Sequence, residues 1–234
     1  MQYTGKSLKT PGARLSTNRF LLRAIYYPWV ALPYPARRVV TSVGIRALLL
    51  LRRARGIERQ VDLTPPEKTF SLSFWGIPRL DPGEYALTVS GSVRSPLTLS
   101  LEELKSLAVV ERQVSLDCVG GSRNNWVMRG VSFESLMDRA QPEGDARTAV
   151  FHCADGYITT HPLEDLIDTA AFIAYAMNGQ EIPAYGYPLR LVAPGKYGYK
   201  WAKWVVRIEL VSGSPKGFWE RRGLPDRAWV GDVR

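Results

Sequence analysis

The chain has 234 residues, of which 45% are hydrophobic and 11% aromatic. This length and composition predict one large globular domain and exclude a disordered or fibrous protein. Only two cysteines occur, Cys118 and Cys153, so the fold does not depend on a disulfide framework. Such sparse usage is typical of a reducing compartment. Because the start of the chain lacks the apolar stretch of a secretory signal, we expect a cytoplasmic protein.

The formal net charge of +9 is concentrated in one segment. Residues 1–60 contain twelve Lys and Arg but one acid, Glu58, whereas the rest of the chain holds nineteen basic and twenty-one acidic residues. Since the remainder is slightly acidic, we expect no nucleic-acid partner. A basic arm suits phosphate groups, among them the headgroups of an anionic membrane surface.

Residues 1–62 are predicted to form a basic, helical N-terminal arm, and residues 63–234 the main domain. Within the arm, residues 20–27 and 39–51 show helical patterns, and three prolines break the segment between them. Apolar residues alternate there with arginines, so such helices either lie on anionic lipid or pack on the domain itself. We favour packing slightly, because most amphipathic helices face the core of their own protein.

The main domain alternates short strands with short helices. Residues 100–107 begin with Ser100 and carry Glu103 at the capping-box position, which predicts a short helix. Other short helices are expected at residues 133–139 and 163–168. Strands are expected at residues 69–74, 85–91, 109–119, 149–153, 170–178, 189–194 and 205–212. Without a regular βαβ repeat, this order predicts an α+β domain rather than a doubly wound parallel sheet.

Cys118 follows the predicted strand at residues 109–119, where Gly120 and Gly121 let the chain turn close to a bound group. A thiolate is a soft ligand suited to transition metals. Arg123, five residues further on, offers a planar fork of donors for an anion. On spacing alone, a small buried structural cysteine is the commoner outcome.

Two other cysteine chemistries have weaker support. A cysteine nucleophile would need an orienting third group beside His152 or His161, and nothing local supplies one. A zinc site would combine Cys118, Cys153 and both histidines. However, His152 and Cys153 are neighbours on a predicted strand, so their side chains point to opposite faces.

Residues 186–204 form a second candidate segment. Four cations lie there within fourteen positions, Arg190, Lys196, Lys200 and Lys203, among glycines and aromatic residues. Lysines neutralise phosphate, and aromatic rings can flank a flat heterocycle. The segment lacks the Walker pattern of a nucleotide loop. It therefore indicates an anionic, ring-bearing ligand, with a solvated surface hairpin as the alternative.

These segments together resemble one known family, the sulfite oxidase-type molybdopterin-dependent oxidoreductases. Residues 114–126 are similar to the family's cysteine loop, and residues 151–157 to its next strand and loop. Residues 174–183, with Ala-Tyr-Ala-Met-Asn-Gly, and residues 187–205 are similar to its most recognisable signatures. The resemblance also includes Trp75 to Pro82 and Phe218 to Gly223, so that it covers roughly residues 65–225 in the family's order.

The resemblance implies a fold and a cofactor. The fold is a molybdopterin-binding domain with mixed short β-sheets and short helices, preceded here by the basic arm. The cofactor is a molybdenum–molybdopterin with one pterin dithiolene and an oxo-molybdenum centre, for which Cys118 supplies the protein's thiolate. Arg123 matches an arginine beside the oxyanion substrate. The positions implied to contact the cofactor are Ser73, Phe74, Trp75, Cys118, Cys153, Tyr185, Arg190, Lys200, Trp201, Ala202 and Lys203.

Three departures bear on the substrate. Leu224 stands where sulfite oxidases carry a tyrosine, and Arg123 is single where they carry an arginine pair. The chain ends at Arg234, without the family's haem and C-terminal dimerisation domains. The resemblance is therefore to short bacterial members, some of which reduce protein methionine sulfoxide with electrons from a membrane partner.

The function implied is a molybdopterin oxidoreductase that performs two-electron oxygen-atom transfer on a small oxyanion or an S- or N-oxide. An electron-transfer partner and peripheral membrane contact through residues 1–60 are expected. Two alternatives stay open. One is a non-catalytic scaffold or membrane-surface adaptor that retains the domain, and the other is a metal-free cysteine hydrolase.

Overall fold

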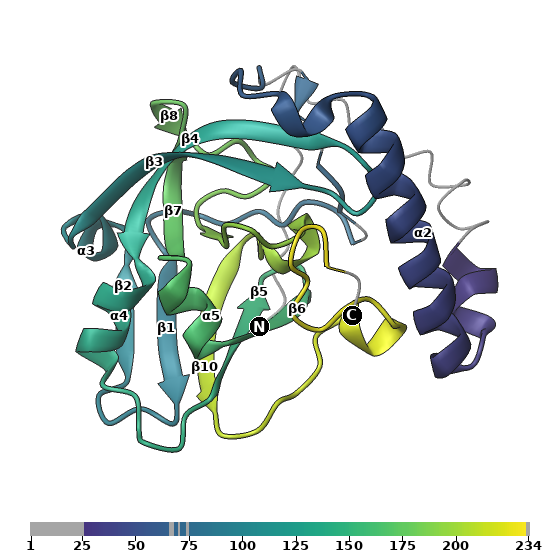
Figure 1. The fold of residues 1–234 in the computed structure, drawn as a ribbon. Helices are drawn as coiled ribbons and strands as arrows, with labels where there is room; N and C mark the ends of the chain where they lie inside the picture. The colour runs from purple at the N-terminus through teal and green to yellow at the C-terminus, as the bar shows by residue number, and fades with distance from the viewer. Residues whose placement is uncertain (1–25, 66–67, 70, 74, 233–234) are drawn as a thin grey trace.

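The structure, a computed structural model, describes residues 26–65, 68–69, 71–73 and 75–232, which fold around two five-stranded sheets (Figure 1). The first sheet has the order β2-β1-β10-β5-β6, formed by Leu97–Ser100, Ala86–Gly91, Val205–Val211, Thr148–Cys153 and Ile158–Pro162. The second has the order β3-β4-β7-β8, formed by Val109–Asp117, Arg123–Ser132, Phe172–Met177 and Gln180–Glu181. Its fifth strand, β9 (Arg190–Val192), also pairs with β7. The predicted α+β class is confirmed.

The helices are short except for one. The longest is α2 (Tyr34–Ala54), and residues 26–31 before it are also helical. The others are α3 (Leu101–Lys105), α4 (Phe133–Ala140) and α5 (Leu163–Asp168), with 3-10 turns η1 (Ile57–Arg59), η3 (Gly198–Lys200) and η4 (Glu220–Arg222). The capping box predicted for α3 is present, because Ser100 and Glu103 bond each other's backbone N–H.

Most predicted elements are confirmed within two or three residues, and one is wrong. The described residues of the segment 69–74 form no strand, although their apolar positions alternate. Four strands were not predicted: β2, β4, β6 and β8. Strand β4 is the important one, since it pairs with β3 on one side and β7 on the other and thus lies inside its sheet.

The helix α2 runs along one side of the domain, beside the end of β3 (Figure 1). It begins at Tyr34 with a proline in its first turn, where a missing N–H costs nothing. Ile45, Leu49 and Arg52 are buried on the face toward the domain. Near its start, Arg38 lies 3.7 Å from Asp226. The described part of the arm therefore packs on the domain, as favoured above.

None of the helices in the described ranges combines the length and the hydropathy needed to cross a membrane. The apolar stretch of α2 is interrupted by arginines, among them Arg46, Arg52 and Arg53.

Candidate functional site

Cys118 lies in a tight loop that joins the antiparallel neighbours β3 and β4. Its backbone N–H donates to the carbonyl of Ser122 at 2.9 Å, and its carbonyl accepts from Gly121 N–H at 2.9 Å. The Gly120 N–H donates to the Cys118 Sγ at 3.3 Å. Gly121 has a φ of +98°, which favours glycine. The paired strands therefore fix the backbone at Cys118, and the glycines close the loop around its sulfur.

The surroundings of Cys118 shift the pKa of its thiol. Burial raises its pKa, while the N–H of Gly120, the Ser122 hydroxyl and the charge of Arg52 act in the opposite direction. A thiol that keeps its proton is a poor nucleophile, whereas a metal ion would take the proton's place.

Both histidines have partners away from the cysteine loop. His152 Nε2 lies 2.8 Å from Glu209 Oε2, and His161 Nε2 lies 2.9 Å from the Lys200 carbonyl. His152 is half-buried and Cys153 is buried, as expected for opposite faces of a strand. In the described part of the chain, no group of three or more His, Cys, Asp or Glu side chains could hold a metal. The zinc arrangement therefore finds no support.

Asp117, which directly precedes the cysteine, is shared by two arginines. Arg123 Nε and Nη2 each donate to its carboxylate at 2.8 Å, and Arg52 of α2 donates to Oδ1. Burial by itself would raise the pKa of Asp117, but the hydrogen bonds from Arg123 and Arg52 hold it below its ordinary value. Two cations thus share one anion beside Cys118.

This arrangement gives Arg123 a structural partner that the sequence did not predict. Its Nη1 donates to the Glu58 carbonyl at 2.8 Å, in addition to the two bonds to Asp117. A guanidinium has five N–H groups, so Nη1 and Nη2 each keep one for another acceptor. The role of Arg123 toward a substrate stays a prediction.

A second cationic cluster lies where the two sheets meet and consists of the buried Arg190 and the half-buried Lys203. Arg190 is 3% exposed and lies over the rings of Trp126 and Trp201, at 5.1 and 6.0 Å from their centroids. Burial lowers the pKa of Arg190 to about 10. Burial, and then the charge of Arg190, lower that of Lys203 to about 7. The Lys203 ammonium donates to Ser71 Oγ at 3.2 Å and to the Leu72 carbonyl.

Comparisons with known proteins show to which protein family the chain belongs. The family described as an oxidoreductase molybdopterin-binding domain matches residues 74–219. The chain belongs to this family. Among its relatives, the uncharacterized oxidoreductase YuiH of Bacillus subtilis is 34% identical over 72% of this chain and 90% of that protein. Human mitochondrial sulfite oxidase is 28% identical over 68% of this chain and 35% of its own length.

Two further proteins extend the comparison of this molybdopterin-binding domain. The catalytic subunit MsrP of a protein-methionine-sulfoxide reductase from Campylobacter jejuni is 29% identical over 58% of this chain and 52% of its own. The sulfane dehydrogenase SoxCD of Paracoccus pantotrophus shares the fold, with a TM-score of 0.62 at 23% identity over 66% of this chain and 45% of that one. The chain thus spans most of YuiH but about half or less of the other relatives.

The residues of the molybdopterin-binding domain fit an anionic cofactor. Among the described residues, neither Arg190 nor Lys203 forms a salt bridge, and Arg190 Nε and Trp126 Nε1 are buried without a hydrogen-bond partner. A buried guanidinium beside a half-buried ammonium, without a counter-anion, is costly in a folded protein. A phosphate-bearing pterin would supply both the negative charge and the missing acceptors.

Four other predicted cofactor residues lie beside this cluster: Cys153, Tyr185, Trp201 and Ala202. Cys153 is buried at the end of β5, and burial raises its pKa. Tyr185 and Ala202 are also buried. Trp201 donates from Nε1 to the Lys196 carbonyl at 3.0 Å, which fixes its ring. Ser73 donates to the Gly76 carbonyl.

Lys200, Trp75 and Phe74 differ from the rest. The ammonium of Lys200 is buried against Glu220 Oε1, at 2.5 Å, so its charge is already neutralised. Trp75 is half exposed and packs edge-on against Phe218, with the ring centroids 4.8 Å apart. Phe74 lies outside the described residues. The contribution of all three to cofactor binding stays a prediction.

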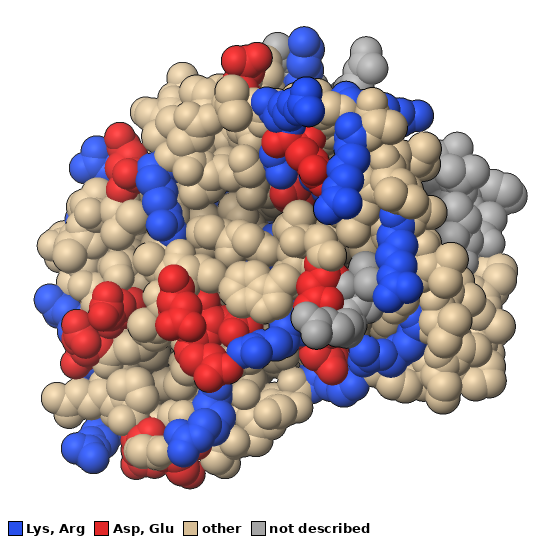
Figure 2. Space-filling view, in the orientation of Figure 1, with Lys and Arg blue, Asp and Glu red and all other residues tan. Residues whose placement is uncertain are grey.

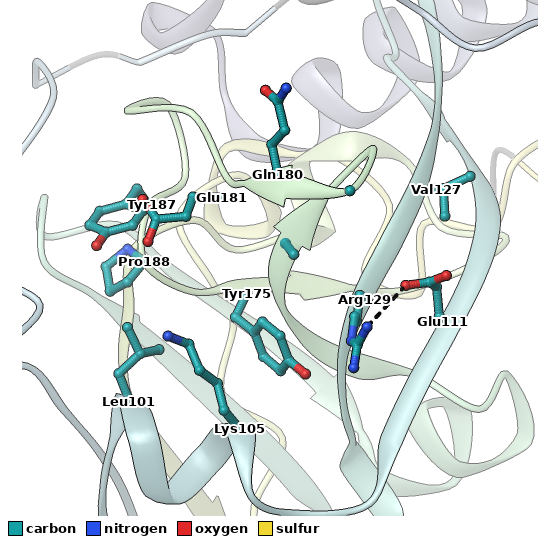
Figure 3. A pocket seen from close by; sticks show the side chains of 12 residues that line it. Leu101, Lys105, Glu111, Val127, Arg129, Tyr175, Gln180, Glu181, Tyr187 and Pro188 are labelled. Atoms are coloured by element: carbon teal, nitrogen blue, oxygen red, sulfur yellow. Dashed lines mark ion pairs between the residues drawn. The ribbon is translucent and has the colours of Figure 1, made fainter.

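Another cavity, of about 300 Å³, lies on the second sheet around the turn between β7 and β8 (Figure 3). Lys105, Tyr175 and Tyr187 line it, and the cross-strand neighbours Arg129 and Glu111 lie together at one side of it, 3.8 Å apart. None of the predicted site residues belongs to this cavity, so it is separate from the cofactor cluster.

Proposed function

We propose that this domain binds a molybdenum–pterin centre through Cys118 and transfers an oxygen atom in a two-electron reaction on a small oxyanion or an S- or N-oxide. The observation that carries the proposal is the cation pair of the buried Arg190 and the half-buried Lys203, neither of which has a salt-bridge partner among the described residues, inside a molybdopterin-binding domain. Relatives named sulfite oxidase and protein-methionine-sulfoxide reductase support this substrate range.

Each part of the site has a distinct task. Cys118 supplies a thiolate from a rigid strand end, and Arg190 with Lys203 neutralises the phosphate of the pterin. The buried side chains of Trp201 and Tyr185 flank the ring system. When bound, the cofactor supplies the two-electron redox chemistry and accepts or donates the oxygen atom. The protein contributes binding, orientation and the exclusion of water.

The atom balance differs between the two directions. Oxidation of an oxyanion takes its new oxygen from water and releases two protons and two electrons. Reduction of an S- or N-oxide consumes two electrons and two protons and releases water. Both directions need an electron-transfer partner.

The proposal is tested by the metal and pterin content of protein purified from a host that makes the cofactor. Near-stoichiometric molybdenum and pterin is the expected result, and it justifies a turnover screen with sulfite, methionine sulfoxide and an N-oxide. Metal-free protein from such a host would contradict the proposal and leave a scaffold that has kept the domain.

Arg123 is proposed to hold an anionic substrate with the N–H groups that Asp117 leaves free. Arg123→Gln is expected to raise KM for an anionic substrate about 10-fold or more, because a charge-assisted hydrogen bond contributes about 1.5–3 kcal/mol. Molybdenum content should fall by far less. If KM and metal content changed in parallel, Arg123 would belong to the cofactor site instead.

The outer face of α2 is proposed to contact an anionic membrane surface. Val39, Val40, Val43, Leu50 and Leu51 are all exposed, and their spacing places them on one side of the helix, opposite the buried side chains. Lys and Arg side chains lie along the α2 side of the molecule (Figure 2). Apolar residues flanked by cations are typical of helices that lie on lipid headgroups. A cytoplasmic location stays a prediction.

Membrane contact can be measured by co-sedimentation with vesicles. The protein is expected to bind vesicles that contain phosphatidylserine and to bind purely zwitterionic vesicles far less. Val43→Glu, at a 61% exposed position, should weaken binding about 10-fold through lost apolar burial. Ile167→Glu, at a 40% exposed position on α5, is the matched control and should change nothing. Equal effects of both variants would refute a specific role for α2.

A further inference from the structure

A cavity of about 310 Å³ lies between the C-terminal end of α2 and the cysteine loop. On the α2 side, Leu48, Leu51, Arg52 and Arg55 line it, together with Ile57. On the other side lie Gly120, Gly121 and Ser122. An ordered water occupies about 30 Å³, so the cavity has room for a small oxyanion with several waters.

The charge around this cavity is positive. Its described lining includes the two arginines and no acidic residue. Asp117 pairs with Arg52 but also with Arg123, so one carboxylate faces two guanidinium groups. Arg55 adds a further exposed cation. The cavity therefore carries a surplus of positive charge, as an anion site requires.

Arg52 also has unsatisfied hydrogen-bonding capacity. It is 2% exposed, its Nη2 donates to Asp117, and its Nε and Nη1 are buried without a partner. Leaving such donors unpaired costs free energy, and an acceptor that entered the cavity would recover it. Asp117 holds the guanidinium in place beforehand, so an anion would not need to order it.

The cavity adjoins the sulfur that the proposed function assigns to the metal. Gly120 lines the cavity and also donates its N–H to Cys118 Sγ at 3.3 Å. Arg52 lies close enough for its charge to act on the same thiol. A ligand bound there would sit beside the cysteine loop rather than at the Arg190 cluster.

We propose that this cavity is an oxyanion-binding site, in which Arg52 and Arg55 hold a small tetrahedral oxyanion next to the Cys118 loop. Arg52 belongs to α2 and Arg55 directly follows that helix, so both lie outside the residues 74–219 that match the family. The arm thus completes the substrate site with groups that the domain lacks. The binding of an oxyanion stands by itself, whereas its role as substrate site rests on the proposed function.

The test is titration calorimetry of sulfate into the full-length protein, in a buffer of low ionic strength without phosphate. The unmodified protein is expected to bind one sulfate. Arg55→Gln should weaken this binding at least about 10-fold, since it removes a charge-assisted hydrogen bond. Arg53→Gln is the matched control, because Arg53 is the neighbouring α2 cation and lies 3.7 Å from Glu58 instead of lining the cavity. It should weaken binding less than about 2-fold.

Arg52→Gln should have the largest effect, but it also removes a partner of Asp117 and can disturb folding. The effect of Arg55→Gln on sulfate binding, at an exposed position, therefore decides the test. No sulfate binding, or equal losses in Arg53→Gln and Arg55→Gln, would overturn the proposal. Molybdenum content is measured separately. Arg55-dependent sulfate binding to metal-free protein would support the oxyanion site and reject the proposed function. Protein that is fully loaded with molybdenum but does not bind sulfate would support the proposed function and reject the oxyanion site.

Discussion

Cys118→Ser is expected to abolish turnover while most of the pterin stays bound. Serine exchanges a soft, strongly donating thiolate for a poorer ligand, whereas the cations proposed to hold the phosphate, Arg190 and Lys203, are unchanged. The loss should exceed the roughly 100-fold that follows removal of a group that only supports a metal ligand. Steady-state turnover is measured alongside molybdenum and pterin content in each preparation.

The second cysteine provides the matched control. Cys153 is buried at the end of β5, and serine is close to cysteine in size, so Cys153→Ser should keep turnover within a few fold. If Cys118→Ser retained full activity, the assignment of Cys118 as metal ligand would be wrong. If both serine variants lost activity together with their pterin, the cysteines would serve cofactor retention instead of catalysis.

Arg190→Met is expected to act in opposite directions on cofactor binding and on stability. Without the guanidinium the domain should lose most of its pterin. The cofactor-free protein, however, should become more stable by about 1–4 kcal/mol, because a buried charge without a counter-ion is replaced by an apolar side chain between Trp126 and Trp201. Chemical denaturation of cofactor-free protein gives the free energy of unfolding, and pterin extraction gives the content.

An exposed arginine serves for comparison. Arg139 in α4 is exposed, so Arg139→Met should leave both pterin content and stability unchanged. A large loss of stability in cofactor-free Arg190→Met would show that Arg190 holds the fold together, and that its cationic charge is not kept for a ligand.

The local parts of this site could be predicted from the sequence. Two segments could be recognised because their functional residues are close together in the sequence. One is the strand followed by Cys118 and two glycines, and the other is the basic aromatic segment around Arg190. The strands β7 and β10 are apolar enough to be recognised. Strand β4 was missed because it starts with Arg123 and two asparagines, whose pairing with β3 and burial depend on the other strands.

The long-range pairings could not be predicted in this way. Nothing near Arg52 indicates that it will meet Asp117, since helices and strands are recognised from their own periodicity and not from their partners. The partner of Lys200 could not be predicted from the sequence either. Its position among cations and glycines suggested a ligand contact, but Glu220 brings its own carboxylate to the ammonium.

The cation pair joins two parts of the molecule that otherwise hydrogen-bond separately. Arg190 begins β9, which pairs with β7 of the second sheet, and Lys203 immediately precedes the segment that pairs with β5 of the first. An isolated antiparallel β-bridge between Arg190 and Lys203 links the two sheets, and the Leu191 N–H donates to the Ala202 carbonyl at 2.8 Å beside it. The Arg190–Lys203 cluster therefore forms only after both sheets have docked. If the pterin binds there as proposed, folding precedes cofactor insertion, and the bound cofactor then stabilises the contact between the two sheets by mass action.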